Sequence, residues 1–383
     1  MTAEVNGGDL SRLRQLNGLS AIRVLREEPA LTLTELARRT GLSRASTEDV
    51  IRELLDRGWV AEAEPTAGAV GRPARRYRYR ADAGHLLGVD IGGHKVLALV
   101  TDLDGAVLHS HRTTVTPEMG RRDRLDATDQ AIAGVLRKAG LTGAQLWATG
   151  VATTGLVDGT GRVMLSDALR EWTGLDLAAH VSRLVGGPVL VENDSKLAAL
   201  AETWRGVARH SRDMVFILSG LRTGVGLIIG GELHRGFANA AGEIGALPAV
   251  GWLRAPEHLS AWMTKTGRSS PEDIFVAARD GDRTAIAAIR RYVKDLAIGV
   301  SALVLTLDPE LVVIGGGFSR SADIMTEPLR RELDRWCIRI PEIRVSVLAD
   351  QGVALGAAKF ALDHVEATLR AGTGLASTDR FSR

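Results

Sequence analysis

The stretch that most constrains the fold is Leu190–Glu202, where an apolar run is interrupted by three polar residues and then continues as a helix. The apolar run ends at Glu192-Asn193-Asp194, after which small apolar residues return at helical spacing. A carboxylate at such a strand-to-helix junction faces a cleft. Two interpretations of Asp194 stay open: a helix cap, since Asn and Asp are preferred there, or a base that accepts a proton from a hydroxyl group.

The length and composition of the chain limit the classes of protein to which it can belong. A chain of 383 residues is expected to form two or three domains, and its net charge of +2 requires any nucleic-acid surface to be local. The single cysteine, Cys337, excludes a disulfide framework and suits a reducing cytoplasm. We find no signal-like segment and no apolar run of membrane-spanning length, so a cytoplasmic protein without a membrane partner is expected.

Residues 10–82 predict a winged helix-turn-helix. Apolar residues keep a helical spacing from Leu10, and a second helix over 34–40 ends at Gly41. Ser43 caps a third helix that reaches about residue 57. Two helices joined by such a short turn are typical of a helix-turn-helix, and the hairpin that follows, with its glycine-containing loop at 65–71, predicts the wing.

The wing carries five arginines within nine residues, and no acid lies between residues 65 and 81. Such a run often forms only a solvated surface. Its place directly after a helix-turn-helix favours DNA contact, and Gly71-Arg72-Pro73 is similar to an arm that enters a minor groove. Glu48 either reads a cytosine or weakens binding, and both interpretations stay open. The candidate DNA contacts are Ser43, Arg44, Ser46, Thr47, Glu48, Arg72, Arg75 and Arg76.

From Leu86 onward, strands and helices alternate. A buried strand ends at Asp90 and the turn Gly92-Gly93, and a hairpin follows at Asp104-Gly105. A similar unit recurs over residues 214–231, so two related lobes facing a cleft are expected. Glycine turns at strand ends let backbone N–H groups approach phosphate oxygens closely. A last helix over 352–369 is expected to pack back on the first lobe.

Five short motifs occur in one order behind the winged helix: Asp90-x-Gly92-Gly93, Glu192-Asn193-Asp194, Thr223-Gly224-Val225-Gly226, residues 241–245 (Ala-Gly-Glu-Ile-Gly) and Gly315-Gly316-Gly317. Together they resemble the ROK family (repressor, open reading frame, kinase). The resemblance implies an α/β fold, in which the winged helix-turn-helix precedes a two-lobed, actin-like (ribonuclease H-like) sugar-kinase domain. The first lobe is expected over 85–200 plus 352–369 and the second over 201–350. The sugar-binding residues that it implies are Asn193, Asp194, Glu243 and Gly155.

The former phosphate loops depart from the family pattern. His94 stands where the family usually has Thr, and Arg222 replaces a small residue before Thr223. These side chains either receive an anionic ligand such as a sugar phosphate or fill space that no nucleotide enters. The resemblance therefore implies no catalytic residue beyond a vestigial base, Asp194, and no cofactor. The loop residues are Asp90, Gly92, Gly93, His94, Arg222, Thr223, Gly224, Gly315 and Gly316.

No structural zinc is expected. The family's motif normally continues from Gly245 with a histidine, where this chain has Ala246, and residues 251–260 contain no thiol. A zinc site needs about four ligands, and this region offers only His258. A separate pair, His109 and His111, has no third ligand nearby and is interpreted as an exposed strand edge.

These observations favour a transcriptional regulator, expected to be a repressor, that acts as a homodimer or homotetramer on a two-fold-related double-stranded DNA operator. A sugar or sugar-phosphate effector would change the closure of the lobes and so the spacing of the winged helices. Two alternatives stay open. One is an active ATP-dependent sugar kinase with an appended DNA-binding domain, and the other is a ligand-independent DNA-binding scaffold.

Overall fold

The N-terminal domain is a winged helix, as the sequence predicts. The computed structural model describes residues 10–63, 74–220 and 222–371. Thr32 and Glu35 form a reciprocal capping box at the start of α2, and Gly41 ends that helix in a left-handed conformation. A three-stranded sheet in the order β1-β3-β2 completes the domain. Its elements are α1 (Leu10–Glu27), β1 (Leu31–Thr32), α2 (Leu33–Thr40), α3 (Arg44–Asp56), β2 (Val60–Glu62) and β3 (Arg76–Tyr79).

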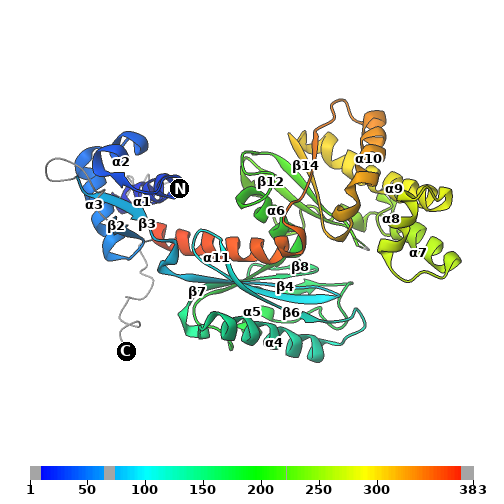
Figure 1. Ribbon diagram of the computed structural model, residues 1–383, viewed down its shortest axis with the longest axis horizontal. Helices are drawn as coiled ribbons and strands as arrows, with labels where there is room; N and C mark the ends of the chain where they lie inside the picture. Colours follow the sequence, from blue (N-terminus) through cyan, green and yellow to red (C-terminus); the bar gives the residue numbers. More distant parts are fainter. Residues whose placement is uncertain (1–9, 64–73, 221, 372–383) are drawn as a thin grey trace, which may run out of the picture.

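The first lobe is built on a five-stranded sheet in the order β10-β7-β4-β5-β6. β4, β5 and β6 form an antiparallel meander, and β7 and β10 add to β4 in parallel. α4 (Arg121–Ala139) covers one face of the sheet and α11 (Gly352–Ala371) covers the other (Figure 1). The strands are β4 (His85–Ile91), β5 (Lys95–Thr101), β6 (Val107–Thr114), β7 (Leu146–Thr153) and β10 (Val189–Asn193).

The second lobe repeats this plan, which confirms the predicted internal repeat. Its sheet has the order β13-β12-β11-β14-β15, with an antiparallel hairpin on one side and two parallel strands on the other. Four helices pack beyond it (Figure 1): α7 (Ala255–Thr266), α8 (Pro271–Arg279), α9 (Arg283–Leu307) and α10 (Ala322–Trp336). The strands are β11 (Met214–Leu218), β12 (Gly224–Ile229), β13 (Glu232–Leu233), β14 (Leu311–Gly315) and β15 (Glu342–Val345).

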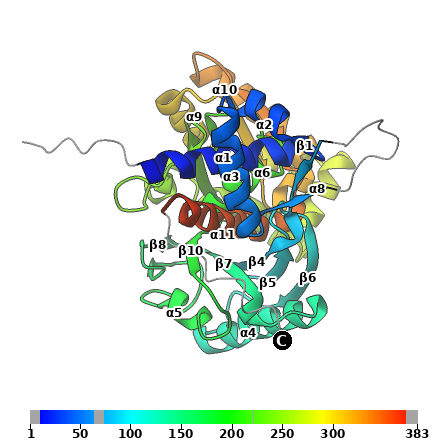
Figure 2. The ribbon, with the colours of Figure 1, turned by 90° about the vertical axis from the view of Figure 1, so that its left-hand side faces the viewer.

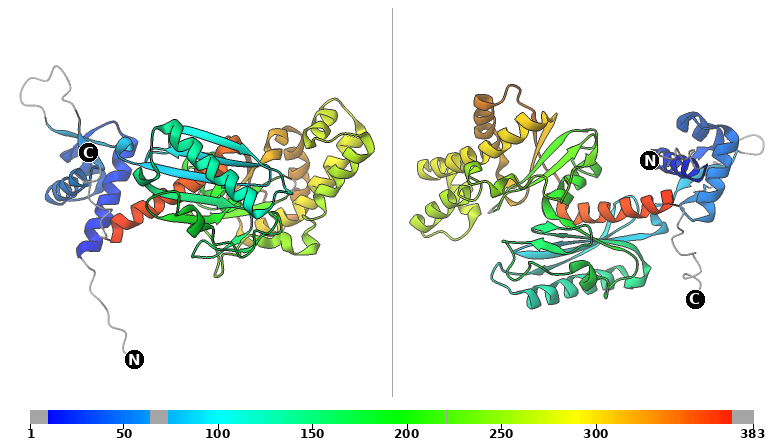
Figure 3. Two further views of the ribbon diagram at one scale, coloured as in Figure 1. Left: turned by 90° about the horizontal axis from the view of Figure 1, so that it is seen from below. Right: turned by 180° about the vertical axis from the view of Figure 1, so that it is seen from behind.

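Two helices, α6 (Asp194–Trp204) and α11, lie between the two sheets (Figure 3). Glycines permit their close packing. A Cβ atom on Gly150 would lie 1.9 Å from the carbonyl oxygen of Ala357, and one on Gly356 would lie 1.8 Å from that of Leu197. Real Cβ atoms do not approach so closely, so any side chain here would separate α11 from β7 or from α6.

The winged helix shares a hydrophobic core with the first lobe. The N-terminal half of α11 packs on the sheet and its last turns reach the winged helix (Figures 1 and 2). The rings of Trp59 and Trp147 meet edge to face with their centroids 5.2 Å apart across this boundary. None of the described helices is long and apolar enough to cross a membrane. Core residues from α1, α3 and α11 include Ile22, Leu25, Ile51, Leu54, Leu362 and Val365.

Candidate functional site

The junction between β10 and α6 has the structure that its sequence predicts, and Asn193 caps the helix. Asn193 Oδ1 accepts hydrogen bonds from the backbone N–H groups of Ser195 (3.0 Å) and Lys196 (3.2 Å). Its Nδ2 donates to the carbonyl oxygen of Gly155 at 3.0 Å. Because Asn193 takes the capping role, the cap interpretation of Asp194 is wrong. The Asp194 side chain is only partly buried.

Asp194 is a carboxylate held in a defined orientation. Its Oδ2 accepts a hydrogen bond from the Thr154 hydroxyl at 2.9 Å, and its Oδ1 accepts one from the Ser195 N–H at 2.7 Å. Burial, and secondarily the nearby carboxylate of Asp90, raises the pKa of Asp194 to about 7. Such a group accepts a hydrogen bond or a proton from a hydroxyl near neutral pH.

Glu243 lies at the start of a short 3-10 helix, Glu243–Ala246, on the side of the second lobe. Burial raises the pKa of Glu243, and the Lys196 ammonium opposes that effect. The Glu243 charge also contributes to raising the pKa of Asp194, so the two carboxyls lie near enough to interact electrostatically. The structure thus brings Asn193, Asp194 and Gly155 into one contact network, with Glu243 near it.

The first glycine loop is supported by an arginine that the sequence analysis missed. Arg124 is fully buried and donates to the carbonyl oxygens of Gly92 (2.6 Å) and Thr116 (2.7 Å). Arg124 lies on the same face of α4 as the buried residues Ala127 and Ala131, and this helical spacing could have indicated that Arg124 is buried. The loop residue Gly93 has open space beside it, and His94 is exposed.

Asp90 faces this loop from the end of β4. Its Oδ2 lies 3.3 Å from Lys95 Nζ, and the same ammonium donates to the carbonyl oxygen of Asp350. Burial raises the pKa of Asp90, and the Lys95 charge opposes that effect. The carboxylate is therefore already paired with a cation of its own lobe.

The second glycine loop and the loop after β14 support one another. The Gly315 carbonyl accepts the N–H of Ser219 at 2.9 Å, and a Cβ on Gly316 would lie 2.5 Å from Ser219 O. The fully buried Tyr292 shares a hydrogen bond with the Ser219 hydroxyl at 3.1 Å. Gly224 lies directly against Ser195 of α6, and the hydroxyl oxygen of Thr223 is buried.

Among the described residues, the contacts that join the two lobes include the following four. Arg222 Nη2 donates to the Asp167 carbonyl at 2.9 Å, so this side chain extends from the second glycine loop to the first lobe. Arg235 Nε lies 2.7 Å from Glu192 Oε2. The remaining two involve Asn239, whose side chain donates to Val157 O at 2.8 Å and whose carbonyl accepts from Lys196 Nζ. Neither Arg235 nor Lys196 is among the site residues that the sequence predicts.

The N-terminal end of α3 presents part of the predicted DNA surface. Ser43 caps the helix through the Ser46 N–H at 3.1 Å, and Arg44 and Glu48 are exposed. The prediction that Thr47 contacts DNA is wrong, because its side chain is fully buried and its hydroxyl donates to Ser43 O at 2.9 Å. Arg52 lies 3.6 Å from the Glu48 carboxylate, which partly neutralises that acid within the helix.

The described part of the wing uses its arginines in different ways. Arg76 donates to Ala30 O at 2.7 Å and lies 3.5 Å from Glu35, so it fixes β3 against the helix-turn-helix. Arg75 is exposed and pairs with Glu62 at 3.0 Å. The loop at 65–71 and Arg72 lie outside the described residues.

Arg44→Ala is expected to weaken DNA binding and to lower the slope of log K against log salt concentration by about 1, because one phosphate contact is lost. Fluorescence anisotropy at several salt concentrations measures both quantities. The matched control is Arg331→Ala, since Arg331 is an exposed arginine on α10 in the second lobe. An unchanged slope in Arg44→Ala would remove α3 from the DNA interface.

The described residues contain no group of three or more His, Cys, Asp or Glu side chains that could hold a metal ion. His258, the single possible zinc ligand in residues 251–260, instead lies 3.0 Å from the Asp295 carboxylate. We expect elemental analysis of purified protein to find no stoichiometric zinc, and chelators to leave the melting temperature unchanged. One tightly held zinc per chain would contradict this prediction.

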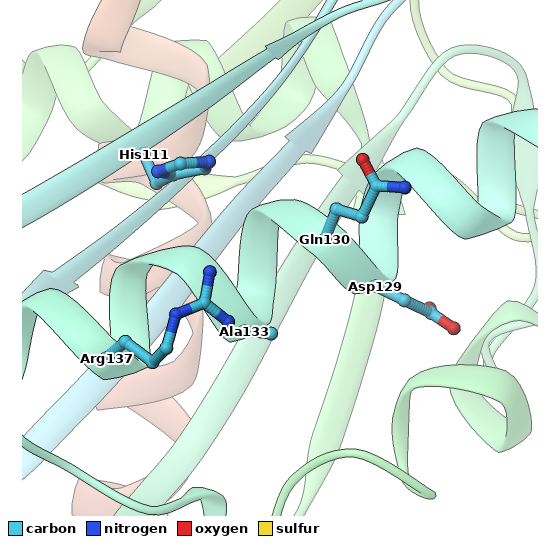
Figure 4. A pocket seen from close by; sticks show the side chains of 5 residues that line it. All are labelled: His111, Asp129, Gln130, Ala133 and Arg137. Carbon is cyan, nitrogen blue, oxygen red and sulfur yellow. The ribbon is translucent and has the colours of Figure 1, made fainter.

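A pocket lies between β6 and α4 of the first lobe (Figure 4). It is lined by His111 of β6 and by Asp129, Gln130, Ala133 and Arg137 of α4. β6 is the edge strand that the sequence predicts, with His109 exposed and His111 partly buried. The His111 ring packs over Gly134, where a Cβ would lie 2.6 Å from the ring.

Two five-stranded sheets with the same strand plan, preceded by a winged helix, define a sugar-kinase-like fold joined to a DNA-binding domain. The chain belongs to the ROK family. The profile described as ROK family matches residues 86–257 and 257–364, and that of the IclR helix-turn-helix domain matches residues 16–64.

Similar proteins of known name fall into two groups. The xylose repressor of Caldicellulosiruptor bescii is 24% identical, over 91% of this chain and 96% of its own length. That of Bacillus subtilis is 22% identical, over 93% of this chain and 97% of its own. The glucokinase of Streptomyces coelicolor is 28% identical but covers 73% of this chain and 98% of its own.

Solved structures divide in the same way. A ROK family glucokinase from Streptomyces griseus, in complex with glucose and AMPPNP, has a TM-score of 0.62 and 26% identity, covering 73% of this chain and 100% of its own. A ROK family transcriptional regulator, a homologue of the E. coli MLC protein, has a TM-score of 0.73 and 20% identity, and the match covers 94% of this chain and 98% of the regulator. At that identity the second likeness shows a shared fold.

Proposed function

We propose that this protein is a transcriptional repressor whose cleft binds a sugar without phosphorylating it. The observation that carries the proposal is the winged helix, which shares a hydrophobic core with the first lobe. The repressors among its relatives match more than nine-tenths of the chain, whereas the glucokinase of S. coelicolor covers 73% of it. The proposal includes a homodimer or homotetramer on a two-fold-related operator.

The second glycine loop supports a non-catalytic cleft. Phosphoryl transfer depends almost entirely on positioning and charge stabilisation around the phosphates. Arg222, a bulky cation in this loop, donates a hydrogen bond to Asp167 O of the first lobe. His94 is a second bulky substitution, at the first loop.

The cleft groups suit a neutral sugar. Asn193, Asp194 and Glu243 supply the carboxylate and amide groups that bind vicinal hydroxyls. Asp90 is paired with Lys95, and Glu192 with Arg235, so these carboxylates are not available to a ligand without breaking an ion pair. D-Xylose and D-glucose are the first candidates, because the relatives are named as xylose repressors and glucokinases.

The test begins with a DNA duplex selected from a random library by the wild-type protein. D-Xylose or D-glucose is then expected to weaken binding to this duplex by about 5- to 150-fold, the usual range of coupling between two sites. The same sugars with ATP and magnesium should release no ADP. Sugar-dependent ADP release would establish the kinase alternative, and a duplex affinity that no sugar changes would favour the scaffold.

A further inference from the structure

The helix α6 runs from the candidate ligand site to a turn that touches the winged helix. Asp194 is its first residue and Trp204 its last. A helix of 11 residues is about 16 Å long. The two ends of α6 therefore lie in two different environments, the cleft and the turn between β5 and β6 (residues 102–106), which we call the junction turn.

The C-terminal end of α6 packs directly on the junction turn. Arg205 Nη2 lies 2.7 Å from the Asp104 carboxylate. Gly105 has a φ of 83°, and a Cβ at this position would lie 2.3 Å from the Trp204 ring. Only glycine allows both that backbone conformation and that close approach. A displacement of α6 along or across its axis must therefore move this turn or break the contact.

The junction turn is internally rigid. Asp102 Oδ1 accepts hydrogen bonds from the N–H groups of Asp104 (2.9 Å) and Ala106 (2.8 Å). Leu103, which lies between Asp102 and Asp104 in the sequence, is fully buried, and its N–H donates to Ala81 O at 3.0 Å. A turn fixed in this way transmits a displacement instead of absorbing it.

The opposite side of the junction turn is bound to the winged helix. The Leu103 carbonyl accepts hydrogen bonds from the Tyr79 hydroxyl at 3.2 Å and from Arg26 Nη2 at 3.3 Å. Arg26 also donates to the Tyr79 hydroxyl at 2.9 Å, and its Nη1 lies 2.7 Å from Glu366 of α11. Arg26 belongs to α1, which packs in one hydrophobic core with the DNA-facing helix α3.

We propose that the junction turn transmits ligand occupancy of the cleft, along α6, to the winged helix. This inference rests on the proposed function, because it concerns the regulation of DNA binding by the same cleft. A sugar that orders Asn193 and Asp194 acts on the first turn of α6. The turn at residues 102–106 then changes its contacts with Arg26 and Tyr79, and α1 moves α3 relative to the DNA.

The test uses the double variant Tyr79→Phe/Arg205→Ala in the full-length protein. Both changes are mild for folding, since Phe keeps the ring and the Arg205–Asp104 pair is partly exposed. In the wild type, saturating D-xylose or D-glucose weakens binding to the selected duplex by at least about 5-fold. In the double variant the change is expected to be less than about 2-fold, with the separate affinities for sugar and DNA within about 2-fold of wild type.

The matched control is Arg209→Ala, an exposed arginine four positions after Arg205, which should keep the full sugar response. Reciprocity gives a second readout, because DNA must weaken sugar binding by the same factor in the wild type and not in the double variant. A double variant that keeps the full response overturns the proposal. So does a variant that loses its response only because it no longer binds sugar.

A third measurement needs no sugar. Binding of the selected duplex alone should change amide hydrogen exchange in residues 102–106 and in α6 of the wild type, and should leave both unchanged in the double variant. No change in α6 of the wild type overturns the proposal. If neither sugar alters DNA affinity but DNA binding still changes hydrogen exchange in residues 102–106 and α6, the proposed sugar sensing is wrong, and the coupling between α6 and the winged helix is supported.

Discussion

Asp194→Asn is expected to stabilise the protein at pH 8 by roughly 2–4 kcal/mol relative to wild type, from about 1.4 kcal/mol per unit of pKa shift, reduced for partial exposure. Burial raises the pKa of Asp194 from 3.8 to about 7. A carboxyl whose pKa is higher in the folded state than in the unfolded state destabilises the fold as it ionises. Wild-type stability should therefore fall between about pH 4 and pH 7, and the neutral Asn lacks this loss.

Urea unfolding of both proteins at pH 4.5 and pH 8 measures this difference. The gap in stability between the variant and the wild type should be much smaller at pH 4.5 than at pH 8, because folded Asp194 is neutral at pH 4.5 and mostly ionised at pH 8, whereas Asn stays neutral. Asp334→Asn, at an exposed position on α10, is the matched control and should show no such separation. Equal stabilities of Asp194→Asn and wild type at both pH values would contradict the prediction.

The same substitution should weaken sugar binding by about 1.5–3 kcal/mol, the range for a hydrogen bond to a charged group. Asn keeps the shape of the side chain and one acceptor, so DNA binding without sugar should stay near the wild-type value. The variant should therefore be more stable and bind ligand more weakly, as expected where a binding site contains a carboxylate whose ionised form is destabilised by burial. If wild type phosphorylates a sugar and Asp194→Asn abolishes that activity, the protein is an enzyme.

The parts of the fold that depend on local sequence were predictable. An apolar run that ends in glycine or in polar residues indicates a buried strand and the position where it ends, as near Asp90, Asp194 and Gly315. The repeat of strand, turn and strand at 214–231 indicated a second lobe, and the two sheets share one strand plan. Ser43 caps α3 as predicted, and the second helix, predicted over 34–40, begins one residue earlier, at Leu33.

The polar contacts between distant segments were not predictable. Arg124 is fully buried although Arg121 and Arg122 stand beside it in the sequence, and no local pattern distinguishes them apart from the apolar face. Arg235 pairs with a residue 43 positions away. Such pairs depend on the packing of whole lobes, which a single sequence does not specify.

The burial of Thr47 follows from the helical period of α3. Thr47 lies three and four positions before Val50 and Ile51, which places it on the same face of α3 as these core residues. Its place near the start of the recognition helix suggested DNA contact, and the helical period should have overruled that suggestion. The same period leaves Arg44 and Glu48 exposed, so these two candidates stay predictions.

Arg235→Ala is expected to destabilise the protein by about 2–4 kcal/mol, the lower part of the range for breaking a buried ion pair, because Arg235 is itself partly exposed. Glu192 is 1% exposed, and Arg235 Nε lies 2.7 Å from its Oε2. The guanidinium also lies over the Phe360 ring of α11, 5.1 Å from its centroid. Removing it leaves a buried carboxylate without its closest cation and loosens the contact between the two lobes.

Two controls separate the charge from the lost packing. Arg331→Ala breaks an exposed pair with Glu327 and should cost less than about 0.5 kcal/mol. Adding Glu192→Gln to Arg235→Ala removes the uncompensated charge and should recover about half of the loss measured by urea unfolding at pH 8. An Arg235→Ala variant as stable as Arg331→Ala would show that Lys196, the other cation near Glu192, already balances the buried carboxylate.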